Sequence, residues 1–295
     1  MQKYIEAFLE EFDYPLDSRE VLAAAYDVIS KNAEASDLFN RALSEYKKNI
    51  NCDYGAYLDE CKVISEDINL HEYTVKFLFF ICLSRELRNH YKNNEYSDEM
   101  YHSAMLDLKY KLIECKLVKG INGSFVANWF SGFFNLTRFA FKRLQFEVKG
   151  AKIDHKSGDK SIKAGDPIIV IHIPRTGTPL SPTECDEDFN KAKEFFKDSF
   201  TDTPIAFSCH SWLVYEKLRE FLSDKSNIIA FMNRFEICYT DFHDLGNYSQ
   251  VWRLFDVDYN GDLNDLPEDS SLRRAFKKYL IDGGKWGAGY GIFFY

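Results

Sequence analysis

The sequence predicts a helical N-terminal domain followed by an α/β domain, and thus a chain of the α+β or α/β class. Helical periodicity of apolar residues dominates the first part of the 295-residue chain. Two strand-to-helix units then follow each other directly, at 166–200 and 204–222. Consecutive units of this kind place parallel strands side by side, so we expect these two strands to be neighbours in one sheet. We expect the domains at 1–122 and 123–295.

Five segments of the first domain show apolar residues at helical spacing. Asp17 and Glu20 form the pattern of a capping box, which predicts a helix start there. Ser97 resembles an N-cap residue, and Gly120 supplies a stop for the helix that Ser97 begins. The expected helices are at 17–29, after Ser36, at 54–63, at 71–90 and at 97–117.

The second domain begins with a short aromatic helix, expected at 125–134. Two alternating stretches follow, and their apolar phase slips by one residue near Lys142 and Arg143, which predicts a β-bulge. The other expected elements are a hairpin at 151–165, a strand at 227–240, a helix at 270–281 and, after glycines from Gly283 to Gly289, a short terminal strand.

Composition excludes several classes of partner. The net charge of -9 comes without a concentrated basic face, which argues against nucleic acid. Seven cysteines without a CxxC pair argue against a cysteine zinc site and a disulfide framework. The longest apolar run, 77–83, is too short for a membrane span, and the acidic N-terminal segment is unlike a signal peptide. We therefore expect a cytoplasmic protein that binds neither nucleic acid nor membrane.

One acidic segment resembles a calcium loop. Residues from Asp256 to Leu263 match the first eight positions of an EF-hand loop. The twelfth position, where a bidentate Glu is needed, is Pro267, and Glu268 comes one residue late. We expect an acidic Asn-Gly turn here and no metal cofactor.

Candidate site residues lie at the ends of the two expected parallel strands, where open α/β sheets usually bind ligands. His172 suits a general base near neutral pH, although a core histidine bonded to a neighbour is the alternative. Cys209 and His210 point to opposite faces of their strand, so Cys209 could form a nucleophile–base pair only with His172. His210, Ser211 and Trp212 are expected to contact substrate, and His210 is also a catalytic candidate.

Five segments of the second half carry a resemblance to a known family. They are RLQFEV at 143–148, HIP at 172–174 with PLSPTECD at 179–186, FSCHSWL at 207–213, LPEDSSLRRA at 266–275 and GGKWGAGYG at 283–291. With the helical first half, they resemble a bacterial N-acyltransferase family that joins a helical N-terminal domain to a GNAT-like C-terminal domain. The resemblance implies a mixed, centrally splayed β-sheet flanked by helices. It also implies transfer of an acyl group from acetyl-CoA or another acyl-CoA to an amine of a small molecule or peptide, by a monomer or homodimer.

The resemblance also implies roles for particular residues. In GNAT enzymes, the loop after the fourth strand cradles the coenzyme A pyrophosphate with backbone amides. The corresponding strand here is 168–173. Tyr215, expected one turn into the next helix, would be the general acid beside His172 as base. The implied cofactor contacts are Arg175, Thr176, Gly177, Thr178 and Leu180.

The start of the helix after this loop departs from the GNAT pattern. Pro179 removes an amide donor, and Ser181 with Glu184 forms the pattern of a capping box. Acidic residues crowd the first turn of the helix, at 184 and 186–188, where they would repel a pyrophosphate. These features favour the alternative of a GNAT-fold protein that binds a small ligand without catalysis. A third alternative is a structural protein that dimerises through its helical half.

Overall fold

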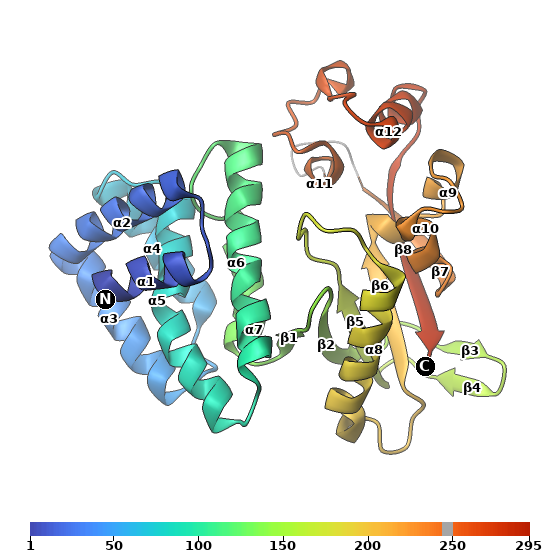
Figure 1. Cartoon of the computed structure of the whole chain (residues 1–295), viewed down its shortest axis with the longest axis horizontal. Helices are drawn as coiled ribbons and strands as arrows, with labels where there is room; N and C mark the ends of the chain where they lie inside the picture. The colour runs from blue at the N-terminus through green and yellow to red at the C-terminus, as the bar shows by residue number, and fades with distance from the viewer. Residues whose placement is uncertain (244–249) are drawn as a thin grey trace. The chain divides into compact units, whose positions relative to one another are not determined.

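The computed structural model describes residues 1–243 and 250–295. It divides into two compact units, Met1–Ala140 and Phe141–Tyr295 (Figure 1). The division lies downstream of the boundary expected at 122/123, because the aromatic segment after that point packs within the first unit. The rings of Phe130 and Phe134 lie 5.4 and 4.9 Å from the ring of Phe80.

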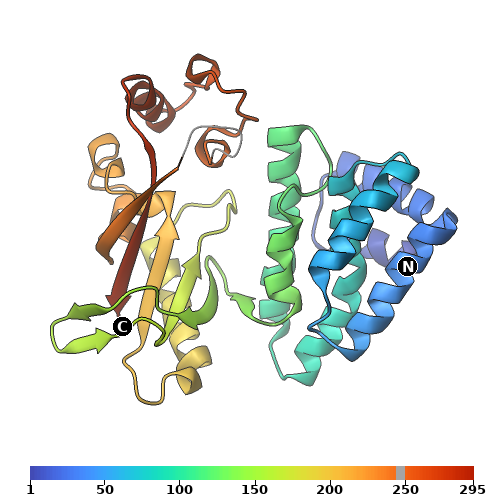
Figure 2. The same cartoon turned by 180° about the vertical axis from the view of Figure 1, so that it is seen from behind.

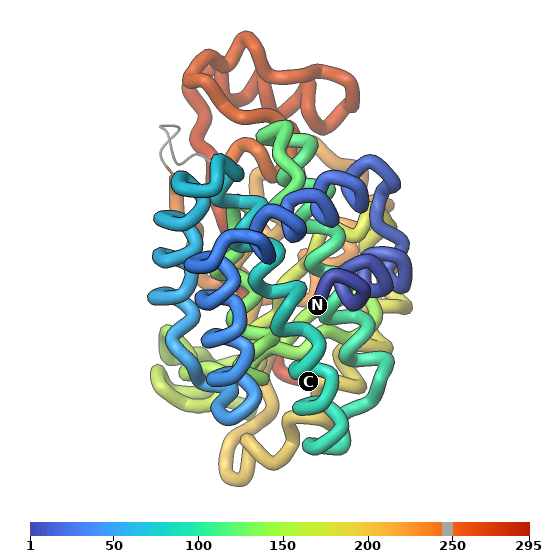
Figure 3. The backbone as a smooth tube through the Cα atoms, turned by 90° about the vertical axis from the view of Figure 1, so that its left-hand side faces the viewer, coloured from blue at the N-terminus to red at the C-terminus, as the bar shows by residue number. Residues whose placement is uncertain are grey.

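The first unit consists mainly of helices arranged around one central helix. Its elements are α1 (Gln2–Glu11), α2 (Leu16–Lys31), α3 (Ala33–Lys48), α4 (Tyr54–Asp67), α5 (Glu72–Asn93), α6 (Asp98–Lys119), the 3-10 turn η1 (Ala127–Phe130), α7 (Ser131–Phe134) and the short strand β1 (Arg138–Ala140). Helix α5 contacts the other five long helices. Every residue of α5 from 77 to 84 is buried, as expected for a core helix that is apolar all round. Figure 3 shows these helices as neighbouring tubes coloured from blue to green.

Two of the predicted helix ends are confirmed and two are wrong. The Ser97 side chain accepts a hydrogen bond from the Met100 amide at 3.2 Å, and Gly120 ends α6 with a φ of 72°. Helix α2 instead follows Pro15 without a side-chain cap, so the Asp17 box does not form. Helix α3 begins before Ser36, because Asn32 caps it.

The second unit contains a mixed sheet with helices. Its elements are β2 (Gln145–Gly150), β3 (His155–Ser157), β4 (Lys160–Ile162), β5 (Pro167–His172), α8 (Pro182–Phe196), η2 (Lys197–Ser199), β6 (Ala206–Ser211), η3 (Trp212–Val214), α9 (Leu218–Phe221), α10 (Asn227–Met232), β7 (Glu236–His243), α11 (Trp252–Phe255), η4 (Leu263–Asp265), α12 (Ser271–Ile281) and β8 (Trp286–Phe294).

Five of these strands lie in the order β2-β5-β6-β8-β7. β5 and β6 are parallel, as predicted, and the other neighbours in this order are antiparallel. β3 and β4 form a separate hairpin, which confirms the excursion expected at 151–165. The mixed sheet with flanking helices confirms the predicted fold class.

Different elements pack against the two faces of the sheet. On one face, the ring of Phe189 in α8 lies 6.1, 5.3 and 5.3 Å from the rings of Phe146, Phe207 and Phe293. The other face carries a second apolar cluster that includes Ile162 of the β3–β4 hairpin. Helix α8 lies across the sheet in Figure 1, and the hairpin lies on the side that Figure 2 shows.

The predicted bulge near Lys142 and Arg143 is wrong. The chain makes a tight turn there, in which the Phe141 amide donates to the Leu144 carbonyl at 3.0 Å. Amides of this turn donate to the side chain of Asp188 in α8. The Asp188 side chain, which is distant in the sequence, therefore holds the turn that separates β1 from β2.

Other local differences lie towards the end of the chain. The first half of the strand expected at 227–240 is helix α10, which Ser226 caps. The helix expected directly after β6 is divided into η3 and α9. Gly287 and Gly289 do not end an element but lie inside the nine-residue strand β8, next to η3. The helix expected at 270–281 is confirmed as α12, with Ser270 as its cap.

Candidate functional site

Two histidines lie where the parallel strands end. Val170 of β5 pairs with Ser208 of β6, and the ladder ends one pair later. Side chains alternate along a strand, so His172 and His210 share the face of Val170 and Ser208. The structure thus brings together two of the predicted catalytic candidates on one face, at the point where β5 and β6 part.

His172 is bound to a buried carboxylate. Its Nε2 lies 2.7 Å from Oε1 of Glu147 on β2, and Glu147 is 3% exposed. Nζ of Lys149 lies 2.9 Å from the same oxygen. A carboxylate in this position fixes the orientation of an imidazole and stabilises its protonated form. The arrangement fits a general base. It also fits the alternative interpretation, a core histidine that is hydrogen-bonded to a neighbour.

His210 forms a second pair with a carboxylate. Its Nε2 lies 3.2 Å from Oδ2 of Asp241 on β7, and its Nδ1 lies 3.5 Å from Nζ of Lys152. Burial and then the Lys152 charge lower the pKa of His210, while Asp241 acts in the opposite direction. The neutral imidazole is therefore favoured near neutral pH, and a neutral ring can accept a proton.

Sequence reasoning did not identify the carboxylates of these two pairs. Glu147 gave little signal, because β2 alternates polar and apolar residues and Glu147 takes a polar position between Phe146 and Val148. Asp241 gave none, because its approach to His210 depends on strand order in the folded sheet.

Cys209 is not brought together with His172. It shares the face of Phe207, which packs against α8, and His172 lies on the opposite face. Cys209 is 1% exposed, and burial raises the pKa of its thiol. The geometry therefore does not support a dyad of these two residues.

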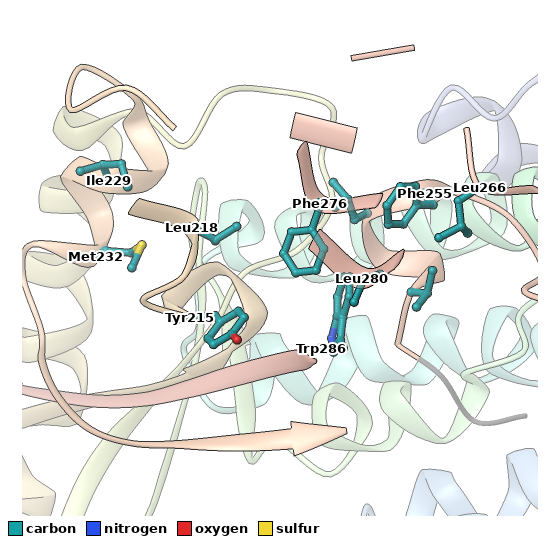
Figure 4. Packing of buried hydrophobic residues seen from close by; sticks show 11 residues of the cluster. Tyr215, Leu218, Ile229, Met232, Phe255, Leu266, Phe276, Leu280 and Trp286 are labelled. Atoms are coloured by element: carbon teal, nitrogen blue, oxygen red, sulfur yellow. The ribbon is translucent and has the colours of Figure 1, made fainter. Parts of the chain in front are cut away.

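Tyr215 lies in an apolar cluster rather than in a helix. It follows η3, and its hydroxyl lies 3.0 Å from the Tyr279 hydroxyl and donates to the Lys285 carbonyl at 3.3 Å. Burial raises the pKa of Tyr215, and Tyr279 adds to the rise. Figure 4 shows Tyr215 in the same cluster as Trp286, and the structure thus gives it packing partners without testing its role as an acid.

The two predicted substrate contacts have structural partners. The Ser211 hydroxyl accepts a hydrogen bond from the Leu213 amide at 3.2 Å and so caps η3. The ring of Trp212 lies 5.9 Å from that of Trp286 and packs against the cluster that contains Tyr215. Their contact with substrate stays a prediction.

The loop between β5 and α8 carries the predicted cofactor contacts. Arg175 forms a two-pronged ion pair with Asp256, and its Nη2 lies 2.7 Å from Oδ2. The hydroxyls of Thr176 and Thr178 lie 2.7 Å apart, on either side of Gly177, whose φ of 76° suits glycine. Leu180 is buried and ends the loop.

The capping box predicted at the start of α8 does not form. Pro182 occupies the first turn as predicted, but the Ser181 side chain makes no capping hydrogen bond. The backbone amides at the start of α8 therefore do not bind the Ser181 side chain as a cap.

The acidic residues of this helix start have positively charged or amide partners. Lys142 lies 3.2 Å from Glu184 and 3.9 Å from Glu187. Arg234 pairs with Asp186 at 2.5 Å, and Asp188 accepts backbone amides. Lys142 and Arg234 thus offset part of the negative charge that was expected to repel a pyrophosphate.

The segment that resembles a calcium loop is held by ion pairs. Asp256, its first position, pairs with Arg175 and Arg273. Within residues 1–243 and 250–295, no group of three or more His, Cys, Asp or Glu side chains could hold a metal ion. Across the same residues, no helix combines the length and apolar character that crossing a membrane requires.

Both halves of the chain match known domain families. Residues 3–136 match the N-acyltransferase N-terminal domain, and residues 139–293 match the GNAT-like C-terminal domain. No curated protein matches the chain by sequence.

The fold is also similar to solved acyltransferase structures. One is a complex with decanoyl-CoA and teicoplanin, at 20% identity and a TM-score of 0.72, covering 98% of this chain and 86% of that chain. Another is a mutant in complex with octanoyl-CoA, at 20% identity, a TM-score of 0.73 and the same coverage of 98% and 86%. A third is a complex with decanoyl-CoA, at 21% identity, a TM-score of 0.71 and coverage of 97% and 85%. At this level of identity the likeness concerns the fold.

Proposed function

Since this chain belongs to the N-acyltransferase family that joins a helical N-terminal domain to a GNAT-like C-terminal domain, we propose that it transfers an acyl group from an acyl-CoA to an amine. The solved acyltransferases of similar fold are complexes with decanoyl-CoA or octanoyl-CoA, which supports medium-chain donors besides acetyl-CoA. One of those complexes contains teicoplanin, and it supports an acceptor that is a small molecule or peptide.

The observation that carries the proposal is the pair of histidines at the parting of β5 and β6. His172, oriented by Glu147, would take the proton of the acceptor amine as the nitrogen attacks the thioester carbonyl. The new C–N bond forms, the C–S bond breaks, and the thiolate of coenzyme A leaves. A proton must then reach that thiolate, and Tyr215 stays the proposed donor.

The loop and the start of α8 are the proposed cofactor contacts. Gly177 and Thr178 are exposed, and Thr176 is half-buried. Because the Thr178 amide donates to the Thr176 hydroxyl at 3.3 Å, the amides of Thr176 and Gly177 are the proposed contacts of this loop. The helix start lacks a side-chain cap. Helix amides without internal partners favour anions. The residues fit a coenzyme A diphosphate better than the sequence pattern indicated, because the expected cap is absent and the nearby acids are paired.

A thermal-shift screen with coenzyme A, acetyl-CoA and decanoyl-CoA tests this function. A ligand present at one hundred times its Kd stabilises the protein by about 2.7 kcal/mol, so we expect a clear shift. No shift with any of these compounds at millimolar concentration would contradict the proposal. A shift without release of free thiol in the presence of amines would favour the alternative of a binding protein without catalysis.

A further inference from the structure

The loop that carries the proposed cofactor contacts is held at both ends by one arginine. Arg143 is 7% exposed and lies in the turn between β1 and β2. Its Nη1 donates to the Pro174 carbonyl at 3.0 Å, and its Nε donates to the Pro179 carbonyl at 3.2 Å. A single planar guanidinium thus binds the backbone immediately before and after the segment 175–178.

Arg143 is itself held in place by helix α8. Asp188, which is 0% exposed, accepts hydrogen bonds from the amides of Lys142, Arg143 and Leu144 at 3.1, 2.6 and 2.8 Å. Asp188 lies in the helix that directly follows the loop. The helix therefore fixes the turn through Asp188, and the turn fixes the loop through Arg143.

The Arg143 charge also acts on the start of the helix. Burial raises the pKa of the Cys185 thiol to about 11, and Arg143 opposes the rise. Cys185 lies in the first turn of α8, so a positive charge lies close to the helix start. Arg143 thus holds the backbone of the loop and also places a positive charge near the helix start, where the loop ends.

We propose that Arg143 is the positioning residue of this loop: it holds segment 175–178 in the conformation that binds the diphosphate of acyl-CoA. The inference rests on the proposed function. The two prolines have no amide hydrogen, so their carbonyls are the backbone groups through which a side chain can hold these positions. Without the guanidinium, both loop ends would lose a partner, and the loop would sample conformations that bind the diphosphate poorly.

The variant Arg143→Lys tests this role, because an ammonium keeps the charge but cannot bind two carbonyls in one plane as a guanidinium does. We expect KM for acyl-CoA to rise tenfold or more, with kcat within about twofold of the wild-type value. Arg219→Lys is the matched control, since Arg219 is in the same unit and donates to the exposed Asn233 side chain. The control should leave both constants unchanged.

A truncated donor separates positioning of the loop from a general structural effect. An acyl-pantetheine thioester carries the reacting group but lacks the diphosphate that the loop would bind. Arg143→Lys should therefore lower kcat/KM for acyl-CoA at least tenfold more than for the truncated donor. Asp188→Asn should act in the same direction, because an amide offers one acceptor oxygen where the carboxylate offers two.

The outcomes separate this inference from the function on which it rests. A wild-type protein that neither binds nor uses any acyl-CoA would refute the proposed function, and the inference with it. A wild-type protein that uses acyl-CoA, together with an Arg143→Lys variant whose KM is unchanged or whose kcat falls as much as KM rises, would overturn the inference alone. An equal loss of kcat/KM for acyl-CoA and for the truncated donor would also overturn the inference alone.

Discussion

At the residue scale, the two histidines differ in their surroundings. His172 is bound to Glu147, a carboxylate almost fully removed from solvent, and the nearby ammonium of Lys149 contacts that carboxylate. His210 lies between the exposed carboxylate of Asp241 and the ammonium of Lys152, which contacts the imidazole ring itself. A buried carboxylate is screened less than an exposed one, so its effect on a protonated imidazole is larger. This contrast favours His172 as the base and makes Glu147 its positioning residue.

Substitution of the two pairs tests that assignment. His172→Ala should lower kcat by about 10²–10⁴-fold, the usual contribution of general base catalysis. Glu147→Gln should lower kcat by less than His172→Ala and should leave KM for acyl-CoA nearly unchanged. Steady-state kinetics of both variants, with Asp241→Asn as the matched change at His210, would measure the difference.

The pH profile gives a second measure of the same assignment. The pKa of His210 is lowered from its ordinary value of 6.5, mainly by burial. A reaction governed by His210 would therefore lose activity only below about pH 6.5, where the ring becomes protonated. Full activity of His172→Ala together with a large loss in Asp241→Asn would transfer the role of base to His210.

At the scale of elements, sequence patterns predicted the helices and strands that depend on residues close to one another in the chain. The strand, loop and helix from β5 to α8 follow from an apolar run, turn residues and Pro182. The turn at 141–144 did not follow, because its acceptor is Asp188 on a helix far along the chain. The pairs of His172 with Glu147 and of His210 with Asp241 could not be predicted, because they depend on the order of the strands in the sheet, which no single segment of the sequence reveals. The sequence thus predicted which strand ends carry the candidate residues, but it did not identify the partners of those residues.

Strand β8 illustrates the same limit and allows a test. A Cβ added at Gly289 would lie 2.1 Å from the Val214 carbonyl oxygen, so the glycine permits η3 to approach the strand. Gly289→Ala should destabilise the second unit by about 1–3 kcal/mol or more, as overpacking does. In Gly150→Ala, the control in β2, the nearest contact is an ordinary 3.4 Å. Denaturant unfolding of both variants would show the difference, and equal stability would contradict the close approach.

At the scale of the whole molecule, the chain forms two units, and the position of their boundary has energetic consequences. Phe130, Phe133 and Phe134 are each 0% exposed, and rings of α5 pack against Phe130 and Phe134. Full burial of a phenylalanine side chain contributes about 1.5–3 kcal/mol. A helical domain that ended at residue 122 would lack these three rings and would leave a hole beside Phe80.

Two fragments of the chain therefore should differ in stability. We expect the fragment 1–140 to unfold cooperatively and at a higher temperature than the fragment 1–122, because only the longer one buries Phe80 against Phe130 and Phe134. Circular dichroism melting of both fragments would measure the difference. The variant Phe130→Ala in the longer fragment should lower its melting temperature towards that of the shorter one. If both fragments melted at the same temperature, the aromatic segment would contribute little to the helical core, and the domain boundary would lie at 122/123, as the sequence pattern indicated.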